Sequence, residues 1–111
     1  MSARADRGAV TAEFAVALPA VVLVLAACLG GLGVALAQIR AQDTAADAAR
    51  VLGRGESIAS ARELVVSSVP HSTLTSSSEG SLVCARVEIE HRLLGVPLRV
   101  AARSCALDGG R

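Results

Sequence analysis

Residues 14–37 read FAVALPAVVLVLAACLGGLGVALA, and this stretch decides the fold of the chain. Its side chains carry no formal charge, and the thiol of Cys28 is the one ionisable group among them. At about 1.5 Å per residue, a helix of this length would measure roughly 36 Å, enough to cross a hydrocarbon core of about 30 Å with some tilt. The sequence therefore predicts a membrane-spanning helix near the N-terminus.

The composition of the remainder limits what the chain can do. The chain has 111 residues, and if residues 1–37 lie in or at a membrane, Gln38–Arg111 can bury only a modest core. There is no Trp or Tyr, and the formal net charge is +1, so the sequence indicates neither an aromatic stacking platform nor a basic face for nucleic acid. We expect no nucleic-acid partner.

Charged residues flank the apolar run. Arg4 and Arg7 precede it, and the bias of positive charge toward the cytoplasmic side predicts a cytoplasmic N-terminus and an extracytoplasmic C-terminal domain. Glu13 stands directly before the run, where a carboxylate is costly unless it is neutralised or paired. A simple anchor has no need for this acid.

Three kinds of processing are compatible with such an N-terminus. Ala35-Leu36-Ala37 fits a signal-peptidase site, although the apolar run is longer than a usual signal sequence. Leu25-Ala26-Ala27-Cys28 reads as a lipobox, with Cys28 as the lipidated residue. Cleavage after Gly8 would retain the whole run and place Glu13 at the fifth position of the mature chain. Of the three, this last alternative accounts for Glu13.

Residues 7–19, RGAVTAEFAVALP, resemble the N-terminal motif of the TadE-like minor pilins of tight-adherence (Flp-type) pilus systems. In that family a prepilin peptidase, a membrane aspartic protease, cuts after the Gly of the motif. The resemblance implies cleavage between Gly8 and Ala9, and it assigns Glu13 and Phe14 to the assembly signature. It also implies three partners: the membrane, prepilin peptidase, and other pilin or TadE-like subunits.

Glu13 has a physical role in such an assembly. In a bundle of parallel helices, Glu13 of one subunit can neutralise the free amine that cleavage creates at Ala9 of another, and the pair sets the axial register. We therefore expect a minor pilin-like or pseudopilin-like structural subunit, at the cell membrane or in a surface pilus. The competing hypothesis is a secreted or lipid-anchored small binding domain, made by cleavage after Ala37 or lipidation of Cys28.

The predicted fold class is α+β, in four parts. These are a cytoplasmic leader over residues 1–8, a transmembrane helix over 9–37, a helix extension with a glycine stop over 38–55, and a small headpiece over 56–111. The helix is expected to run from about Val10 to about Leu52. Small residues recur at every fourth position, which indicates either a helix–helix contact face or chance in an Ala-rich helix: Ala27, Gly31 and Ala35, and Gly33, Ala37, Ala41, Ala45 and Ala49.

The headpiece is expected to hold a second helix over Glu56 to about Val66, a short strand over residues 71–75, and a C-terminal hairpin. Apolar residues alternate along residues 83–89 and again along 98–102, with Leu94-Gly95 between them. If the hairpin turn lies there, the residue numbers of any two paired positions add up to 189. Val87, Ile89, Val100 and Ala102 would then share an apolar face that can lie on the N-terminal helix.

That register places Cys84 opposite Cys105 and Glu90 opposite Arg99. Directly opposed strand positions have a separation that suits a disulfide, and an extracytoplasmic location would let it form. The sequence contains no nucleophile–base set, no phosphate-binding loop and no cluster with metal-ligand spacing. We expect no enzyme activity, no cofactor and no metal.

Overall fold

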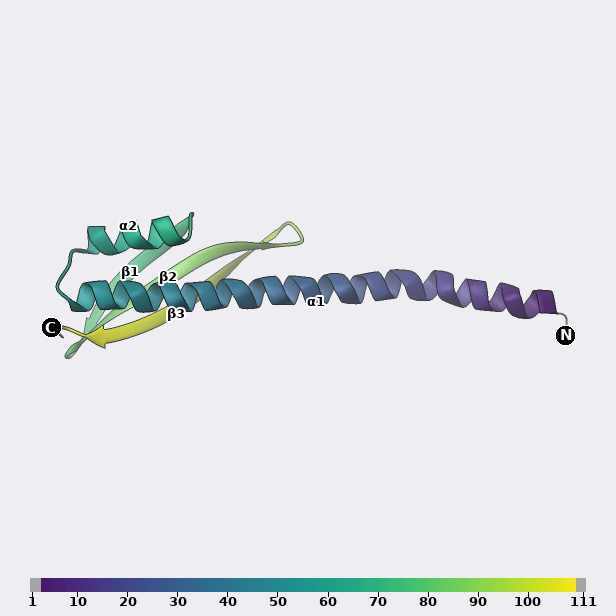
Figure 1. Ribbon diagram of the computed structural model, residues 1–111, viewed down its shortest axis with the longest axis horizontal. Helices are drawn as coiled ribbons and strands as arrows, with labels where there is room; N and C mark the ends of the chain where they lie inside the picture. Colours follow the sequence, from purple (N-terminus) through teal and green to yellow (C-terminus); the bar gives the residue numbers. More distant parts are fainter. Residues whose placement is uncertain (1–2, 110–111) are drawn as a thin grey trace. The chain divides into compact units, whose positions relative to one another are not determined.

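The computed structural model describes residues 3–109 of the chain, and the surroundings of side chains from Gly8 to Gly109. It has an α+β fold, as predicted, with helices α1 and α2 and an antiparallel sheet of β1, β2 and β3 (Figure 1). The bounds are α1 Ala3–Gly53, α2 Ile58–Ser68, β1 Ser72–Glu79, β2 Leu82–Leu93 and β3 Val96–Leu107.

The chain divides into two compact units, Met1–Leu32 and Gly33–Arg111, hereafter unit 1 and unit 2. Helix α1 contributes to both. The packed unit thus begins at Gly33, within the apolar run and ahead of the expected membrane boundary at Ala37. Two residues of the expected leader, Met1 and Ser2, and the side chains of Arg4 and Arg7, lie outside the described part.

In the described part of unit 1, no other element of the chain covers the helix, which is called bare below. Its side chains from Gly8 onward are exposed, except that Ala26 and Gly30 are half-buried. The helix starts at Ala3, earlier than the expected Val10, and continues through Pro19. In the apolar window that is long enough to cross a membrane, 6% of the residues are buried. An exposed apolar surface of this kind is expected of a helix that is surrounded by lipid or packs against other helices.

The sheet of unit 2 has the order β1-β2-β3. The predicted hairpin register is confirmed, because Cys84 pairs with Cys105 and Glu90 pairs with Arg99. Strand β1 extends beyond the strand expected over residues 71–75, because it also includes Ser76–Ser78, which pair with residues 83–85. These serines suggest a loop by propensity, but a half-solvated edge strand accepts them, since strand propensity depends on context.

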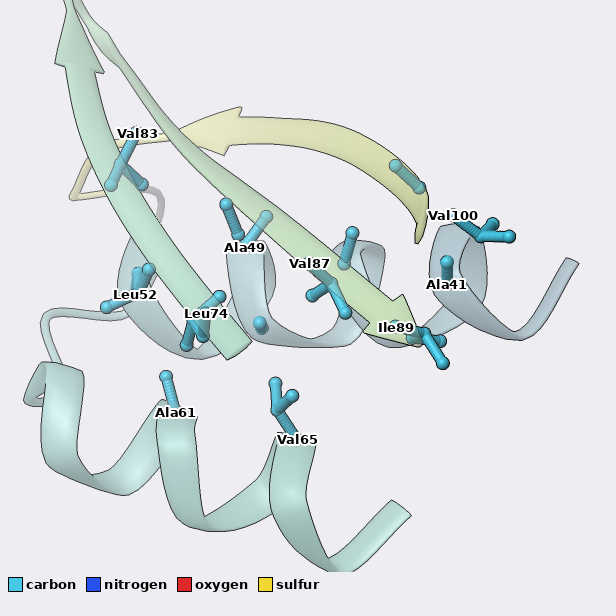
Figure 2. Packing of buried hydrophobic residues seen from close by; sticks show 14 of the residues in the cluster. Ala41, Ala49, Leu52, Ala61, Val65, Leu74, Val83, Val87, Ile89 and Val100 are labelled. Atoms are coloured by element: carbon cyan, nitrogen blue, oxygen red, sulfur yellow. The ribbon is translucent and has the colours of Figure 1, made fainter. Parts of the chain in front are cut away.

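The core of unit 2 lies between α1, α2 and the sheet (Figure 2). Alanines form the contribution of α1, and Ala41, Ala45 and Ala48 are fully buried. Small side chains let the helix axis approach the sheet closely. The expected apolar face of the hairpin is part of this core, which comprises Ala37, Ala41, Ala45, Ala48, Ala49, Leu52, Ala61, Val65, Leu74, Val83, Ala85, Val87, Ile89, Val100 and Ala102.

Side-chain amides of α1 bind the outer edge of β3. Gln38 Nε2 donates to the carbonyl of Ala101 at 3.1 Å, and Gln42 Nε2 donates to the carbonyl of Arg103 at 3.3 Å. The successive contacts show that β3 runs in the same direction as α1. At these two positions the edge strand is covered, which removes acceptors that could pair with a foreign strand.

Glycine ends α1 where the helix meets the end of β3. A Cβ on Gly53 would stand 2.9 Å from the carbonyl oxygen of Leu107, and the Gly53 carbonyl accepts from Gly109 N at 2.9 Å. The predicted stop is therefore confirmed, and steric contact adds a second reason for it. Helix α2 begins two residues later than expected because Ser57 caps it, its hydroxyl accepting from Ser60 N at 3.2 Å.

A larger side chain in the alanine face should push α1 off the sheet. We expect Ala45→Leu to lower the free energy of unfolding of unit 2 by about 1–3 kcal/mol, the usual cost of overpacking. Hydrogen exchange of the β2 amides in the detergent-solubilised chain measures this directly, since core amides exchange through global opening.

The matched control is Ala35→Leu, the same change at an exposed position of the same helix. It should alter the unfolding free energy by no more than about 0.5 kcal/mol. Equal effects of the two substitutions would contradict a close-packed α1–sheet interface.

Candidate functional site

The residues of the predicted cleavage and assembly motif lie together on the bare part of α1. Gly8, Ala9, Glu13 and Phe14 are all exposed, and the Phe14 side chain is 66% exposed. Glu13 makes no ion pair with the side chains described for residues 8–109. Ala9 and Glu13 are four residues apart, so they lie on one face of the helix, one turn apart. A single neighbouring helix can therefore contact both positions.

Among residues 8–109, whose side chains are described, no contact gives a reason for glycine at position 8. A Cβ added there would meet no atom within 4 Å, and glycine in a helix interior costs roughly 0.5–1 kcal/mol relative to alanine. Gly53 differs, because its Cβ would collide with the backbone of β3. Contacts within the described part of the chain therefore do not account for a glycine at this position.

The small residues that recur at every fourth position of α1, from Ala27 to Ala49, form a ridge with two different environments. From Gly33 to Ala49 it faces the headpiece: Ala37 is 8% exposed and Ala49 is 1% exposed. This half of the ridge is used within the chain, so its interpretation as a contact face between subunits is wrong. Ala27, Gly31 and Ala35 are exposed.

A disulfide joins Cys84 of β2 to Cys105 of β3 on the face of the sheet away from α1, closing a sequence separation of 21 residues. Cys84 is 1% exposed, and Arg103 Nη2 lies 3.4 Å from its Sγ. In the chain-entropy model, a loop of this size stabilises the fold by about 3 kcal/mol. The third cysteine, Cys28, is free and exposed.

Charged side chains occupy the same outer face of the sheet. Arg99 is opposite Glu90, as predicted, but its ion pair is with Glu88, the diagonal neighbour, at 3.8 Å. Arg86 also binds Glu88, at 3.2 Å, and Arg103 binds Glu79. Every side chain in these pairs is at least about a third exposed, so each pair contributes little to stability.

The described residues form no group of three or more His, Cys, Asp or Glu side chains that could hold a metal ion. His91 belongs to the face of β2 toward α1, where its Nε2 stands 3.1 Å from the position of a Cβ on Gly33. His71 is exposed and has a φ of 62° in the turn before β1. Each histidine thus has a structural place in the chain.

The turn of the β2–β3 hairpin lies at Leu94-Gly95, as predicted, but the sequence led to no prediction of a function for it. The two turn residues Leu94 and Gly95 have φ angles of 51° and 81°, and Leu94 is 79% exposed. The signal was available, because two-residue turns with positive φ at both positions strongly prefer Asn-Gly or Asp-Gly, and this chain has Leu-Gly.

Comparison with known proteins gives two matches. The family model described as TadE-like protein matches residues 8–50, which begin at the predicted cleavage site and end near the end of α1. A Mycobacterium tuberculosis protein named "Apoptosis inhibitor Rv3655c" is 35% identical over 96 residues, covering 86% of this chain and 75% of that protein. No solved structure matches the chain.

The disulfide can be tested by counting thiols. We expect the denatured chain to take up one maleimide, at Cys28, before reduction and three after it, because Cys84 and Cys105 are bonded. The double variant Cys84→Ser/Cys105→Ser should lose about 3 kcal/mol of unfolding free energy, while Cys28→Ser should not. Three adducts without prior reduction would show that the bond does not form in cells.

Proposed function

Since the chain belongs to the TadE-like protein family, we propose that it is a minor pilin or pseudopilin, trimmed by prepilin peptidase after Gly8. The family is pilus-associated and structural rather than catalytic. In this role the chain acts through its helix, which packs beside pilin or TadE-like subunits during assembly of a pilus or a secretion complex. The small headpiece is carried on the other side of the membrane.

The observation that carries the proposal is the exposed Glu13 on an otherwise apolar, bare helix. In a membrane, a lone carboxylate costs about 2.5–3.5 kcal/mol on insertion scales. The amine of Ala9 on a neighbouring trimmed subunit offsets this cost by direct pairing. Because Ala9 and Glu13 share a helix face and lie one turn apart, a single neighbouring helix can contact both positions, and an amine–carboxylate pair formed there fixes the axial stagger of the two helices.

Gly8 supports the same function. The described part of its own chain places nothing against it, whereas a protease subsite beside the scissile bond can require the absence of a side chain. The requirement for glycine then comes from the processing enzyme and not from folding.

The disulfide supports the proposed topology. Disulfides persist in oxidising compartments, which favours an extracytoplasmic location for unit 2. Arg4 and Arg7 on the other side of the apolar run favour a cytoplasmic N-terminus. The two arguments are independent and give the same orientation.

The core of unit 2 favours retention of the apolar helix. A signal-peptidase cut after Ala37 would remove Ala37, which is 8% exposed, and Val34, which packs against the core. A lipid on Cys28 would be followed directly by more apolar helix, where a lipoprotein usually has a flexible polar leash. Cleavage after Gly8 leaves both the core and the helix complete.

Substitution of Glu13 tests the assembly role. In cells that make the complete system, we expect Glu13→Ala and Glu13→Gln to reduce the assembled share of the chain by roughly tenfold or more, because the amine of Ala9 loses its partner. The assembled share is the chain found in sheared surface material plus high-mass complexes in mild detergent extracts.

The control is Asp43→Ala, which removes an exposed acid from the same helix beyond the apolar run. It should assemble like the unaltered chain, and all variants should start at Ala9 by intact mass. Equal assembly of the Glu13 variants and the control would refute the pairing role.

A further inference from the structure

We propose that the β2–β3 hairpin tip, residues 93–98, inserts into the boundary between lipid headgroups and acyl chains beside α1. This inference rests on the proposed membrane span. It adds a second, peripheral contact of the headpiece with the same bilayer, on the extracytoplasmic side.

The tip lies at the end of unit 2 where the apolar run enters it. His91 packs against Gly33, whereas at the far end of the unit Leu107 meets Gly53. Gly33 to Ala37 are the last residues of the apolar run, so a spanning helix places them at the membrane surface. From His91 the strand continues by three residues to Leu94, about 10 Å at 3.3 Å per residue. Within unit 2, the tip is therefore at the end of the hairpin nearest to Gly33, where α1 enters the unit.

The tip is apolar and uncovered. Its sequence is Leu93-Leu94-Gly95-Val96-Pro97-Leu98, in which Leu94 is 79% exposed and Val96 is 57% exposed. Elsewhere in the described sheet, the exposed turn at Glu79-Gly80-Ser81 is polar. A solvated hairpin tip has no use for this apolar cluster, and a membrane interface does.

The turn conformation adds an independent argument. Leu94 has a φ of 51°. This left-handed region disfavours residues with a bulky side chain, and Asn or Asp would fit the first turn position better. The turn therefore has a strained backbone at Leu94, which places a leucine at its apex. Strained backbone conformations are often found at sites that contact ligands.

Charge around the tip matches a phospholipid surface. Arg92 is exposed and lies opposite Pro97, on the face of the hairpin away from α1. The next arginine on that face, Arg99, is 84% exposed in its side chain. With the apolar turn below the headgroups, the Arg92 guanidinium can reach phosphate by extending along the interface.

The test uses the absence of tryptophan in this chain, since each introduced Trp is then the only one. The full chain is reconstituted in vesicles of phosphatidylcholine and phosphatidylglycerol that contain lipids brominated near the middle of the acyl chain. Three reporters are compared: Leu94→Trp at the tip, Ser77→Trp on β1 away from the tip, and Leu25→Trp in the apolar run.

We expect Leu94→Trp to be blue-shifted and quenched by the brominated lipid at least roughly twofold more than Ser77→Trp. Trp itself prefers interfaces and could draw the tip into the membrane. A fourth reporter, Leu98→Trp, therefore has its quenching measured both with native Leu94 and with Leu94→Asp. The aspartate should reduce quenching of Leu98→Trp to the level of Ser77→Trp. Arg92→Gln should remove the extra quenching that anionic vesicles give over neutral ones.

The reporters separate the possible failures. If Leu25→Trp is quenched and Leu94→Trp is not, the tip is solvated and the inference is wrong while the span stands. If Leu94→Trp is blue-shifted without quenching, protein covers the tip, which also overturns the lipid assignment. If Leu25→Trp is itself unquenched, the membrane span fails and this inference fails with it.

Discussion

The close approach of α1 to the sheet is the contact on which unit 2 depends. An alanine face, with Ala41, Ala45 and Ala48 fully buried, lets β2 and β3 lie against the helix, and Gln38 and Gln42 hold the β3 edge. Such a core buries few large side chains, so its stability is modest. The Cys84–Cys105 bond compensates by constraining the unfolded chain.

The two parts of helix α1 expose different kinds of side chain. Its N-terminal part exposes Val, Leu and Phe side chains, and its C-terminal part exposes Arg, Gln and Asp while burying Ala. A backbone in lipid must satisfy its own hydrogen bonds, and one continuous helix does so across the change of solvent.

Periodicity and spacing were sufficient to predict most of the fold. The apolar run predicted α1, Gly53-Arg54-Gly55 predicted its end, and period-two alternation with Leu94-Gly95 predicted the hairpin register. Register in turn predicted that Cys84 faces Cys105. These features are local in sequence or follow from a single turn, so no tertiary knowledge was needed.

The remaining features depend on tertiary contacts. The serines of β1 form a strand because β2 pairs with them, and the small residues from Gly33 to Ala49 pack on a sheet that the helix sequence cannot reveal. Arg99 pairs with Glu88 because twist favours the diagonal neighbour. Of the candidate site, the motif around Glu13 could be read from the sequence, whereas the exposure of the hairpin tip required the packed unit.

The most direct test is the N-terminus of the chain as cells make it. Intact mass and N-terminal sequencing of protein extracted from membranes should show a chain that begins at Ala9 and keeps the apolar helix. A chain that begins at Gln38, or one that begins at a lipid-modified Cys28, would contradict a retained helix aligned by Glu13.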